Sequence, residues 1–444
     1  MLSPHDVVEL SVEKPAAGGR MIARHQGQVV LVSGAIPGER VRARIERADR
    51  TLAYATAEDI LQPHASRRPV RGDWTCGGNV YAFIDYPHQL TIKTDVIRDA
   101  FARLGKMPLD REIPVTPSRE AGYRMRARLQ VLGGRAGFYR EGTHELCDPA
   151  ATGQLLPETA RVIEQVSQRI KKIDAEGVLA IELSESMSGA ERALHLQLRP
   201  ARRTRTIVFS PIAGVSGVTG ATCQLVSGAP VVRLGGQPQV GDTMADVLAA
   251  TGAPARFGEV RLERHPRAFF QANRYLLPSL VRTVLAQVPA EGEVIDLYAG
   301  VGLFAMALAA SGRDGVTAVE GDRISGTDLA ANARRAGDAV HVELQSVERY
   351  LADRGGTPAP TLIVDPPRTG LSRAALDGVL AHGAQRIVYV SCDIATLARD
   401  VRQAVDRGYT LTHLEAFDLF PNTAHIETLA VLERARTPDL QSRP

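Results

Sequence analysis

The stretch VIDLYAGVGLFAMALA, residues 294–309, decides the fold because it changes from strand to helix across two glycines. It begins as a short, mostly apolar strand. Gly300 and Gly302 then allow a tight turn and let a ligand approach backbone N–H groups closely. A helical stretch follows the turn. This order predicts an α/β fold with a ligand site at the carboxyl end of the strand.

The same alternation of strand and helix fills the second half of the chain, from about residue 256 to residue 436. The strand-like segments there are EVIDLYAG, GVTAVEGD, AVHVELQS, PTLIVDPPRTG, RIVYVSCD, TLTHLEAFDLFP and HIETLAVLER. Their apolar cores without alternation indicate a sheet that is covered on both faces. Repeated βα units predict a doubly wound, mostly parallel sheet.

The first 62 residues alternate apolar and polar positions, with glycine and proline at the joints. About five short strands in such a span predict a small closed barrel of the OB kind. Barrels of this kind often hold single-stranded nucleic acid, although a generic small β domain fits the same pattern.

The segment 63–255 mixes helices and strands and predicts an α+β domain. Apolar residues at helical spacing indicate helices at 87–106 and 156–173. Gly133-Gly134 predicts the turn of a hairpin. The stretch 195–211 is expected to add strands.

Composition limits the class of protein. Hydrophobic residues make up 44% of the 444 residues and charged residues 23%, which is typical of a soluble globular protein. No window approaches about 18 uninterrupted apolar residues, and the amino terminus lacks a secretion signal. We expect a cytoplasmic protein of three domains: a barrel at 1–62, a central α+β domain at 63–255 and an α/β domain at 256–444.

Arginine is unevenly distributed, although the net charge is only +3. Four clusters stand at 39–50, 67–71, 123–130 and 199–206. Guanidinium groups suit phosphate contacts, so the clusters favour a polyanionic partner. Solvated strand faces would show the same pattern.

The four cysteines, Cys76, Cys147, Cys223 and Cys392, are far apart and form no C-x-x-C pair. This spacing disfavours a zinc site and a disulfide scaffold. Each cysteine therefore fits either a core position or a reactive thiol.

Two acidic residues follow strands near the glycine turn. Glu320 ends the next strand, where a carboxylate can grip two ribose hydroxyls, so a nucleoside-containing cofactor is expected. NAD and S-adenosylmethionine both meet this description, and a lone G-x-G also fits a plain turn. Asp365, in LIVDPPRTGL, would bring a carboxylate into the same site, although Asp-Pro-Pro also fits a rigid turn.

Cys392 stands where the strand RIVYV (386–390) ends and a helix begins. A cysteine there can be a small core residue or a nucleophile. Partial burial would raise its pKa, whereas the helix N-terminus opened by Asp393 and a nearby Arg368 would lower it.

A thiolate beside a methyl donor suggests a specific reaction. Its addition to carbon 6 of a pyrimidine makes carbon 5 nucleophilic, after which a base must remove the carbon-5 proton. Glu427 is our candidate for that base, because burial can raise the pKa of a carboxylate. A strand-edge surface glutamate is the alternative, and His425 fits a base or a structural donor.

The ordered segments FFQANRYL (269–276), DLYAGVGLF, DPPRTGL, VSCDIATLARD and HIETLAVL resemble the motifs of RNA 5-methyluridine methyltransferases. DLYAGVGLF also resembles motif I of class I methyltransferases, and the amino-terminal barrel is similar to a TRAM domain. The resemblance implies Cys392 as nucleophile and Glu427 as base. It places S-adenosylmethionine among Gln271, Tyr298, Gly300, Gly302, Glu320 and Asp365. The TRAM-like barrel favours 23S ribosomal RNA over transfer RNA as the substrate.

The chain departs from this family at several positions. Asp393-Ile394 replaces the usual Asn-Pro, and Leu303 stands where some members carry asparagine. Many members bind a 4Fe–4S cluster through four cysteines. Val70 and Asn79 occupy two of those positions here, so we expect no iron–sulfur cluster and treat Cys76 and Cys147 as plain structural residues.

The target uracil must leave its stack to reach a buried thiolate, so a flipped or single-stranded base is required. Phe269, Phe270 and Tyr123 are candidate stacking residues, and each also fits the core. Two other functions remain open. An amino-group nucleic-acid methyltransferase would use the Asp365 loop without a thiolate, and a catalytically degenerate protein would only bind RNA.

Overall fold

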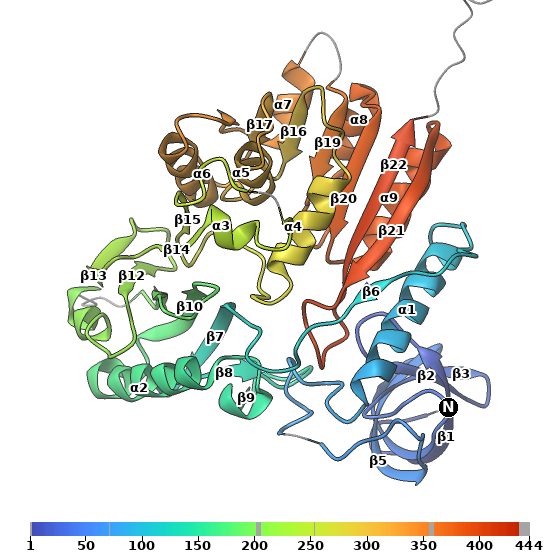
Figure 1. The fold of residues 1–444 in the computed structure, drawn as a ribbon. Helices are drawn as coiled ribbons and strands as arrows, with labels where there is room; N and C mark the ends of the chain where they lie inside the picture. The colour runs from blue at the N-terminus through green and yellow to red at the C-terminus, as the bar shows by residue number, and fades with distance from the viewer. Residues whose placement is uncertain (1, 71, 201–205, 253, 355–358, 435–444) are drawn as a thin grey trace, which may run out of the picture.

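The structure is a computed structural model that describes residues 2–70, 72–200, 206–252, 254–354 and 359–434. Figure 1 shows a barrel at the lower right, a second sheet at the lower left and a large sheet with flanking helices above them. The three sheets thus follow one another in the order of the chain, except that helix α1 (Tyr86–Arg103) and strand β6 (Val115–Thr116) pack with the carboxyl-terminal sheet.

The first strands close into the predicted barrel, in the order β1-β2-β3-β5-β4. Their bounds are Val7–Pro15, Met21–His25, Gln28–Ser33, Arg40–Ala48 and Leu52–Gln62 for β1 to β5. In β4 the side chains of Val41, Ala43 and Ile45 are buried, and the arginines between them are exposed. This alternation directs the apolar side chains to the interior of the barrel and the arginines to its outside.

The second sheet has seven strands in the order β13-β12-β11-β10-β7-β8-β9. The bounds are Arg126–Leu132 (β7), Arg135–Tyr139 (β8), Leu146–Cys147 (β9), Val178–Glu185 (β10), Arg192–Leu198 (β11), Gly220–Leu225 (β12) and Val232–Gly236 (β13). The hairpin at Gly133-Gly134 is confirmed. Helix α2, Pro157–Asp174, packs with the short 3-10 helices η1, Ala150–Thr152, and η2, Thr206–Ile212.

One prediction for this segment is wrong. Residues 206–211 belong to η2 and not to a strand. Pro211 lies inside η2, and proline has no N–H to offer to a β ladder. Phe209 is instead buried against the sheet. Part of the arginine cluster at 199–206, residues 201–205, lies outside the described residues.

The third sheet confirms the predicted doubly wound α/β fold. Its eight strands follow the order β18-β17-β16-β19-β20-β22-β21-β6, and β16 to β20 are parallel. The strand bounds are Val115–Thr116 (β6), Val294–Leu297 (β16), Val316–Val319 (β17), His341–Glu343 (β18), Thr361–Val364 (β19), Arg386–Ser391 (β20), Tyr409–Phe417 (β21) and Glu427–Arg434 (β22).

Helices cover both faces of this sheet. One apolar core includes residues of α3 (Met244–Val247), α4 (Leu277–Ala286), α5 (Leu303–Ala310) and α6 (Arg323–Arg335). The other includes residues of α1 (Tyr86–Arg103), α7 (Val347–Asp353), α8 (Arg373–His382) and α9 (Ile394–Asp406). The central strands β17 and β19 are therefore buried along their whole length, as expected for a doubly covered sheet.

Helix α1 and strand β6 belong to the predicted central segment but pack with the carboxyl-terminal sheet and the barrel. β6 pairs with β21, and α1 contacts α9 and the barrel strand β1. Figure 1 shows α1 between the barrel and the red strands β21 and β22. The boundaries at 62/63 and 255/256 stay predictions, but residues 86–116 contribute to the carboxyl-terminal sheet.

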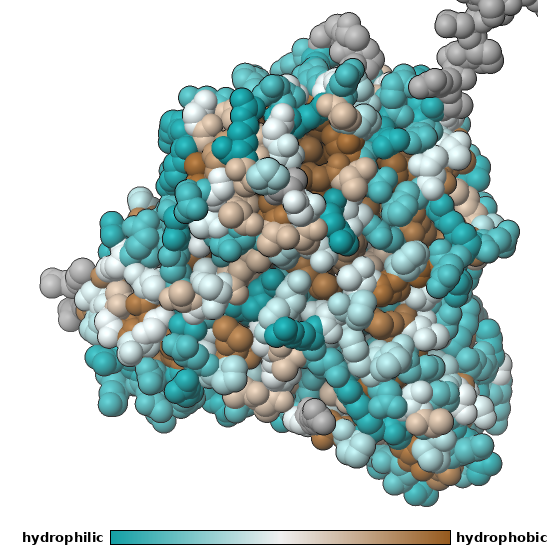
Figure 2. Space-filling model, in the orientation of Figure 1, coloured by the Kyte–Doolittle hydropathy of each residue, from teal (hydrophilic) through white to brown (hydrophobic). Residues whose placement is uncertain are grey.

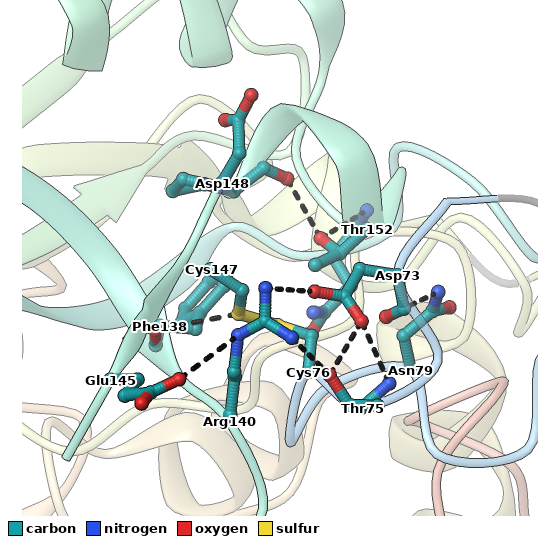
Figure 3. The surroundings of a disulfide bond; sticks show 12 residues. Asp73, Thr75, Cys76, Asn79, Phe138, Arg140, Glu145, Cys147, Asp148 and Thr152 are labelled. Carbon is teal, nitrogen blue, oxygen red and sulfur yellow. Dashed lines mark hydrogen bonds and ion pairs between the residues drawn. A yellow bond between two sulfur atoms is a disulfide. The ribbon is translucent and has the colours of Figure 1, made fainter. Parts of the chain in front are cut away.

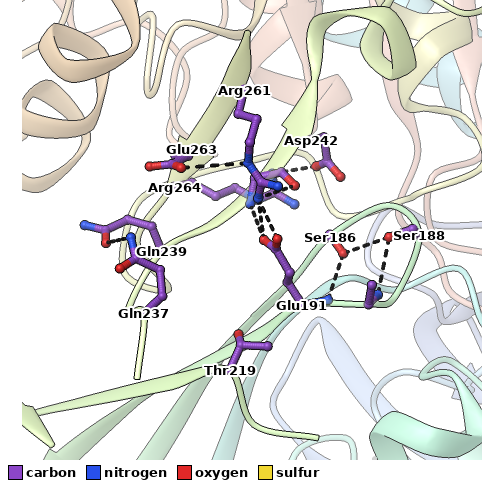
Figure 4. A network of polar contacts seen from close by, with 12 residues as sticks. Ser186, Ser188, Glu191, Thr219, Gln237, Gln239, Asp242, Arg261, Glu263 and Arg264 are labelled. Atoms are coloured by element: carbon purple, nitrogen blue, oxygen red, sulfur yellow. Dashed lines mark hydrogen bonds and ion pairs between the residues drawn. The ribbon is translucent and has the colours of Figure 1, made fainter. Parts of the chain in front are cut away.

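A short ribbon of β14 (Val240–Thr243) and β15 (Arg261–Arg264) connects the second and third sheets. Figure 4 shows Arg261 reaching Glu191, in the turn between β10 and β11, at 2.6 Å. Arg264 is buried and contacts Asp242 at 2.7 Å and the Glu185 carbonyl at 2.6 Å. These contacts fix the ribbon against the central sheet.

The surface in Figure 2 is mostly hydrophilic, and apolar side chains show as scattered patches, the largest of them towards the top of the view. None of the described helices combines the length and the apolar character that a membrane span requires.

A disulfide joins Cys76 to Cys147, which corrects the expectation that both are plain structural residues without a disulfide. Both side chains are buried, and their Cα atoms are 5.8 Å apart. Cys76 forms an isolated bridge with Arg140, which lies on the segment that leads from β8 to β9. Figure 3 shows Arg140 contacting Asp73 at 3.0 Å and Thr75 at 2.7 Å. Sequence spacing could not reveal this contact, because 71 residues separate the two cysteines.

The disulfide should be detectable and stabilising. Thiol titration of the unfolded, unreduced chain should detect two thiols, those of Cys223 and Cys392. Replacing Cys147 with alanine should lower the free energy of unfolding by about 2–4 kcal/mol, because the cross-link restricts the unfolded chain. Calorimetry with and without reductant measures the effect. The variant itself should be insensitive to reductant, and four thiols in the wild type would contradict the assignment.

Candidate active site

Strand register aligns three of the predicted residues at one edge of the large sheet. Leu297 pairs with Val319 on one side and with Val364 on the other. The next residue of each strand is Tyr298, Glu320 or Asp365. The structure therefore brings these three residues together at the carboxyl ends of β16, β17 and β19, where parallel sheets bind ligands.

The glycine turn lies directly above this level. Gly300 and Gly302 have φ angles of 59° and 97°, which disfavour other residues. A Cβ atom on Gly302 would stand 2.8 Å from the Leu329 side chain, so the turn also needs the space. Asn332 of α6 donates a hydrogen bond of 2.9 Å to the Val301 carbonyl and anchors the turn from outside.

Glu320 is held by backbone groups on both carboxylate oxygens. Oε2 accepts the Gly300 N–H at 2.7 Å, and Oε1 accepts the Asp322 N–H at 2.5 Å. Burial raises the pKa of Glu320, and these hydrogen bonds oppose the rise. The carboxylate is thus fixed beside the turn before any ligand arrives.

Gln271 and Asp365 meet across the same pocket. Gln271 Nε2 donates to Asp365 Oδ2 at 3.1 Å. Burial raises the pKa of Asp365 to about 7, and the Gln271 hydrogen bond lowers it. The pocket is lined by Phe269, Phe270, Gln271, Tyr298, Ala299, Gly300, Val301, Leu303, Phe304 and Asp365. A mixture of apolar walls and two directed polar groups suits a nucleoside-like ligand.

Sequence reasoning missed two residues that support this pocket, Asp296 and Asn332. Asp296 is buried in β16, and its Oδ2 accepts the Ala305 N–H at 3.0 Å at the start of α5. Burial raises its pKa well above the usual range. An acidic residue inside the otherwise apolar VIDL strand was the signal for Asp296, whereas nothing in the sequence marks Asn332.

Cys392 and Glu427 meet through antiparallel pairing. Ser391 of β20 pairs with Thr428 of β22, so Cys392, one residue beyond, is beside Glu427, one residue before. Cys392 is half-buried. Asp393 caps α9 by accepting the Thr396 N–H at 2.9 Å, which places the thiol just ahead of a helix N-terminus.

Burial dominates the electrostatics of the thiol. The pKa of Cys392 is raised to about 12, first by burial and then by Glu427 and Asp365. Arg368 and a backbone hydrogen bond lower it, as expected, but do not compensate. Without bound ligands the thiol form is therefore favoured at neutral pH.

Glu427 is almost completely buried, with 3% of its surface exposed, and its Oε1 has no hydrogen-bond partner. Burial, followed by the neighbouring Asp365, raises the pKa of Glu427 well above its usual range, and Arg368 opposes the rise. His425 lies close by, and burial lowers its pKa to about 4, so its imidazole is neutral at pH 7. A strand-edge surface position for Glu427 is thus excluded.

The departures from the family pattern have local explanations. Asp393 is a helix cap, and Ile394 is buried against the core that contains α9. Leu303 is buried at the start of α5 and lines the pocket. Asp393 and Ile394 thus have structural roles next to Cys392, and Leu303 has one next to the glycine turn.

The three aromatic candidates differ in exposure. Tyr123 and Phe270 are core residues, whereas Phe269 is 50% exposed beside the pocket. Arg126 lies 5.8 Å from the Phe269 ring. Phe269 is therefore the one of the three that is able to stack on a base.

The arginine clusters are partly neutralised. On the outside of the barrel, Arg42 pairs with Asp59 at 2.5 Å and Arg44 with Glu58 at 2.5 Å. Exposed ion pairs of this kind contribute about 0–1 kcal/mol, so the arginines can exchange their partners for phosphates. Arg128 similarly pairs with Glu182 at 3.0 Å on the central sheet.

A larger hollow, of about 880 Å³, lies over α2 and the turn between β7 and β8. It contains none of the predicted site residues. The described residues also contain no group of three or more histidine, cysteine or acidic side chains that could hold a metal ion.

Comparisons with known proteins agree with this geometry. The family model for tRNA (uracil-5-)-methyltransferase matches residues 356–435, and the TRAM domain model matches residues 5–58. An uncharacterized RNA methyltransferase of Thermosynechococcus vestitus is 30% identical over 451 residues, which cover 96% of this chain and 97% of that protein. The 23S rRNA (uracil(1939)-C(5))-methyltransferase of Halomonas elongata is 30% identical over 459 residues, with 96% and 89% coverage.

Among solved structures, the tRNA (uracil-54, C5)-methyltransferase of Pyrococcus abyssi, in complex with S-adenosyl-L-homocysteine, matches with a TM-score of 0.71 and 22% identity. The match covers 96% of this chain and all of that one. It shows that the fold is shared over the whole length. Taken with the relatives above, the chain belongs to the family of RNA uracil-5 methyltransferases.

The reactivity of Cys392 should depend on Arg368. Arg368→Gln removes the positive charge that favours the thiolate, so the pKa of Cys392 should rise further and its alkylation should slow severalfold at a fixed pH below about 10. Peptide mass spectrometry after timed iodoacetamide labelling measures the rate. Arg373→Gln, which removes a fully exposed arginine of α8, is the matched control. Equal rates in the two variants would contradict the electrostatic assignment.

Proposed function

We propose that this protein methylates carbon 5 of uridine in RNA, with S-adenosylmethionine as methyl donor and a covalent Cys392 adduct. The single observation that carries the proposal is the pairing of Ser391 with Thr428, which sets a half-buried thiol beside a buried carboxylate. Amino-group methylation needs no such pair. Membership of the family supports the same reaction.

The residues at the sheet edge fit S-adenosylmethionine. Glu320 is held in place to accept hydrogen bonds from the two ribose hydroxyls. The glycine turn lets the cofactor approach its backbone N–H groups closely. Gln271, Tyr298 and Asp365 would line the remainder of the site. When bound, this cofactor supplies a methyl group on a positively charged sulfur.

Cys392 would open the reaction on the RNA base. In the thiolate form, its sulfur donates an electron pair to carbon 6 of uracil, and the electron pair of the 5,6 double bond moves into an enolate, whose carbon 5 is nucleophilic. The high pKa of the free thiol means that this step needs a local change on substrate binding. Arg368, which already favours the thiolate, is the residue that supports it.

Glu427 would close the reaction. Once carbon 5 carries the methyl group, the carboxylate takes the proton from carbon 5. The electrons of that C–H bond restore the 5,6 double bond, and the thiolate leaves carbon 6. Burial raises the pKa of Glu427, which makes its carboxylate a stronger base than that of an exposed glutamate.

Ribosomal RNA is the substrate that we favour, in the cytoplasm. The TRAM-type barrel and the relative that acts on 23S ribosomal RNA support this choice. The proposed barrel domain at 1–62 and central domain at 63–255 would bind the RNA backbone through their arginines. Phe269 would stack on a base that is displaced near the pocket.

Replacing the base should trap the intermediate. Glu427→Gln should reduce turnover by about two to four orders of magnitude, because the carbon-5 proton stays in place. The methylated RNA should remain bonded to Cys392 and migrate with the protein on a denaturing gel. Cys392→Ala should give neither adduct nor product.

Glu433→Gln is the matched control, because Glu433 lies at the far end of the same strand and pairs with Arg386. This variant should turn over like the wild type. Activity that survives Cys392→Ala, with the label on an exocyclic nitrogen, would establish the amino-group alternative. RNA binding without donor consumption in the wild type would establish the degenerate alternative.

The substrate class can be read from cells. Mass-spectrometric mapping of 5-methyluridine, in total RNA from cells with and without the gene, should show one or more sites lost from 23S ribosomal RNA. Transfer RNA should keep its 5-methyluridine. Loss confined to transfer RNA would reverse the assignment of the substrate while leaving the chemistry intact.

A further inference from the structure

The loop at residues 418–426 connects β21 to β22 and delivers Glu427 to the site. Phe417 and Glu427 pair across its base. Glu427 Oε1 has no hydrogen-bond partner, so no hydrogen bond holds the carboxylate in place at that oxygen. Its position depends on the backbone, both of strand β22, which Glu427 begins, and of the loop before it.

Groups from outside the loop contact five successive loop residues, 418–422. Lys93 contacts Asp418 and the Phe420 carbonyl. Asn273 Nδ2 donates a hydrogen bond of 2.9 Å to the Leu419 carbonyl, and the Tyr123 hydroxyl donates one of 3.3 Å to the Pro421 carbonyl. Gln89 contacts Asn422. Two of these four residues, Gln89 and Lys93, come from α1, one helical turn apart on the same face.

Gln89 forms a two-way clamp on Asn422. The Asn422 N–H donates to Gln89 Oε1 at 2.9 Å, and Gln89 Nε2 donates to Asn422 Oδ1 at 2.9 Å. Asn422 has a φ angle of 63°, in the left-handed region that asparagine adopts more readily than most other residues apart from glycine. The N–H of Tyr81 adds a bond of 2.9 Å to the Asn422 carbonyl.

Lys93 forms the second clamp. Its ammonium group contacts Asp418 Oδ1 at 2.5 Å and the Phe420 carbonyl at 3.2 Å. Both charged side chains are buried, with 1% and 0% of their surface exposed. A buried pair of this kind does little for net stability but specifies one geometry, because either charge alone is strongly disfavoured.

We propose that α1 is a positioning element for Glu427, acting through Gln89 and Lys93 on the loop 418–426. The inference rests on the proposed function, in which Glu427 removes the carbon-5 proton. Helix α1 also contacts the barrel strand β1, but the positioning of Glu427 does not depend on that contact. Gln89 and Lys93 do not reach the reacting atoms, so they are positioning residues.

Gln89→Ala tests the proposal on the step that Glu427 performs. Adduct formation at Cys392 should keep its rate, whereas release of methylated RNA should slow by about tenfold to a hundredfold, the cost of a misplaced catalytic group. The covalent complex should therefore accumulate during turnover, as it should for Glu427→Gln. Hydrogen exchange of the Asn422 amide should become faster. A denaturing gel of quenched time points measures both rates.

Asp99→Ala is the matched control. Asp99 lies on the same helix and pairs with Lys14 of the barrel at 2.7 Å, without a contact to the loop. Asp99→Ala should leave the release of methylated RNA at the wild-type rate.

A second variant separates positioning from stability. Lys93→Met alone leaves a buried carboxylate without its cation and is expected to unfold the protein in part. The double variant Lys93→Met, Asp418→Leu removes both charges and fills the same buried space with apolar side chains. Its melting temperature should therefore stay within a few degrees of the wild-type value. Its adduct should nevertheless accumulate, because the loop has lost one of the contacts that hold it.

These variants test the proposed function and the positioning role of α1 separately. If the wild type and Glu427→Gln form no adduct with RNA and labelled donor, the proposed function fails, and the positioning role fails with it. If Glu427→Gln traps the adduct but Gln89→Ala and the double variant release product like Asp99→Ala, the positioning role alone is overturned. A parallel loss of adduct formation and release in both test variants would also overturn it, in favour of a general structural role.

Discussion

The antiparallel pairing of β22 with β20 is the constraint on which the site depends. A doubly wound sheet of parallel strands brings its carboxyl ends to one edge, so a residue that starts a parallel strand would lie at the opposite edge. Because β22 runs against β20, its first residue, Glu427, comes to the same edge as Cys392. The reversal of one strand thus places a second functional group beside the thiol.

This arrangement places several acidic side chains in the buried interior of the site. Asp296, Asp365 and Glu427 all have raised pKa values, and burial is the first cause for each. The same surroundings disfavour the Cys392 thiolate, and the positive charge of Arg368 only partly offsets the effect. Burial therefore favours the thiol form of Cys392, and it makes Glu427 a stronger base whenever its carboxylate is ionised.

Much of the fold follows from local patterns in the sequence. Alternation in β4 and the apolar runs in β16 and β19 are sufficient to predict a barrel and a covered parallel sheet. The glycine turn, Glu320 and Cys392 were recognisable because each stands at the end of a predicted strand. The 3-10 helix η2 was mistaken for a strand, since a short apolar run does not reveal its partner. The packing of α1 against α9 and the disulfide between Cys76 and Cys147 could not be predicted, because both join segments far apart in the chain.

The sequence by itself determined the elements of this protein, the order of its motifs and the residue types available for chemistry. Only the tertiary structure decided which of those residues meet, how deeply they are buried and which charged groups lie near them. Strand and turn preferences act over a few residues, so a single chain displays them directly. Register, desolvation and the contacts of Gln89 and Lys93 with the loop before Glu427 depend on groups that become neighbours only after the chain has folded.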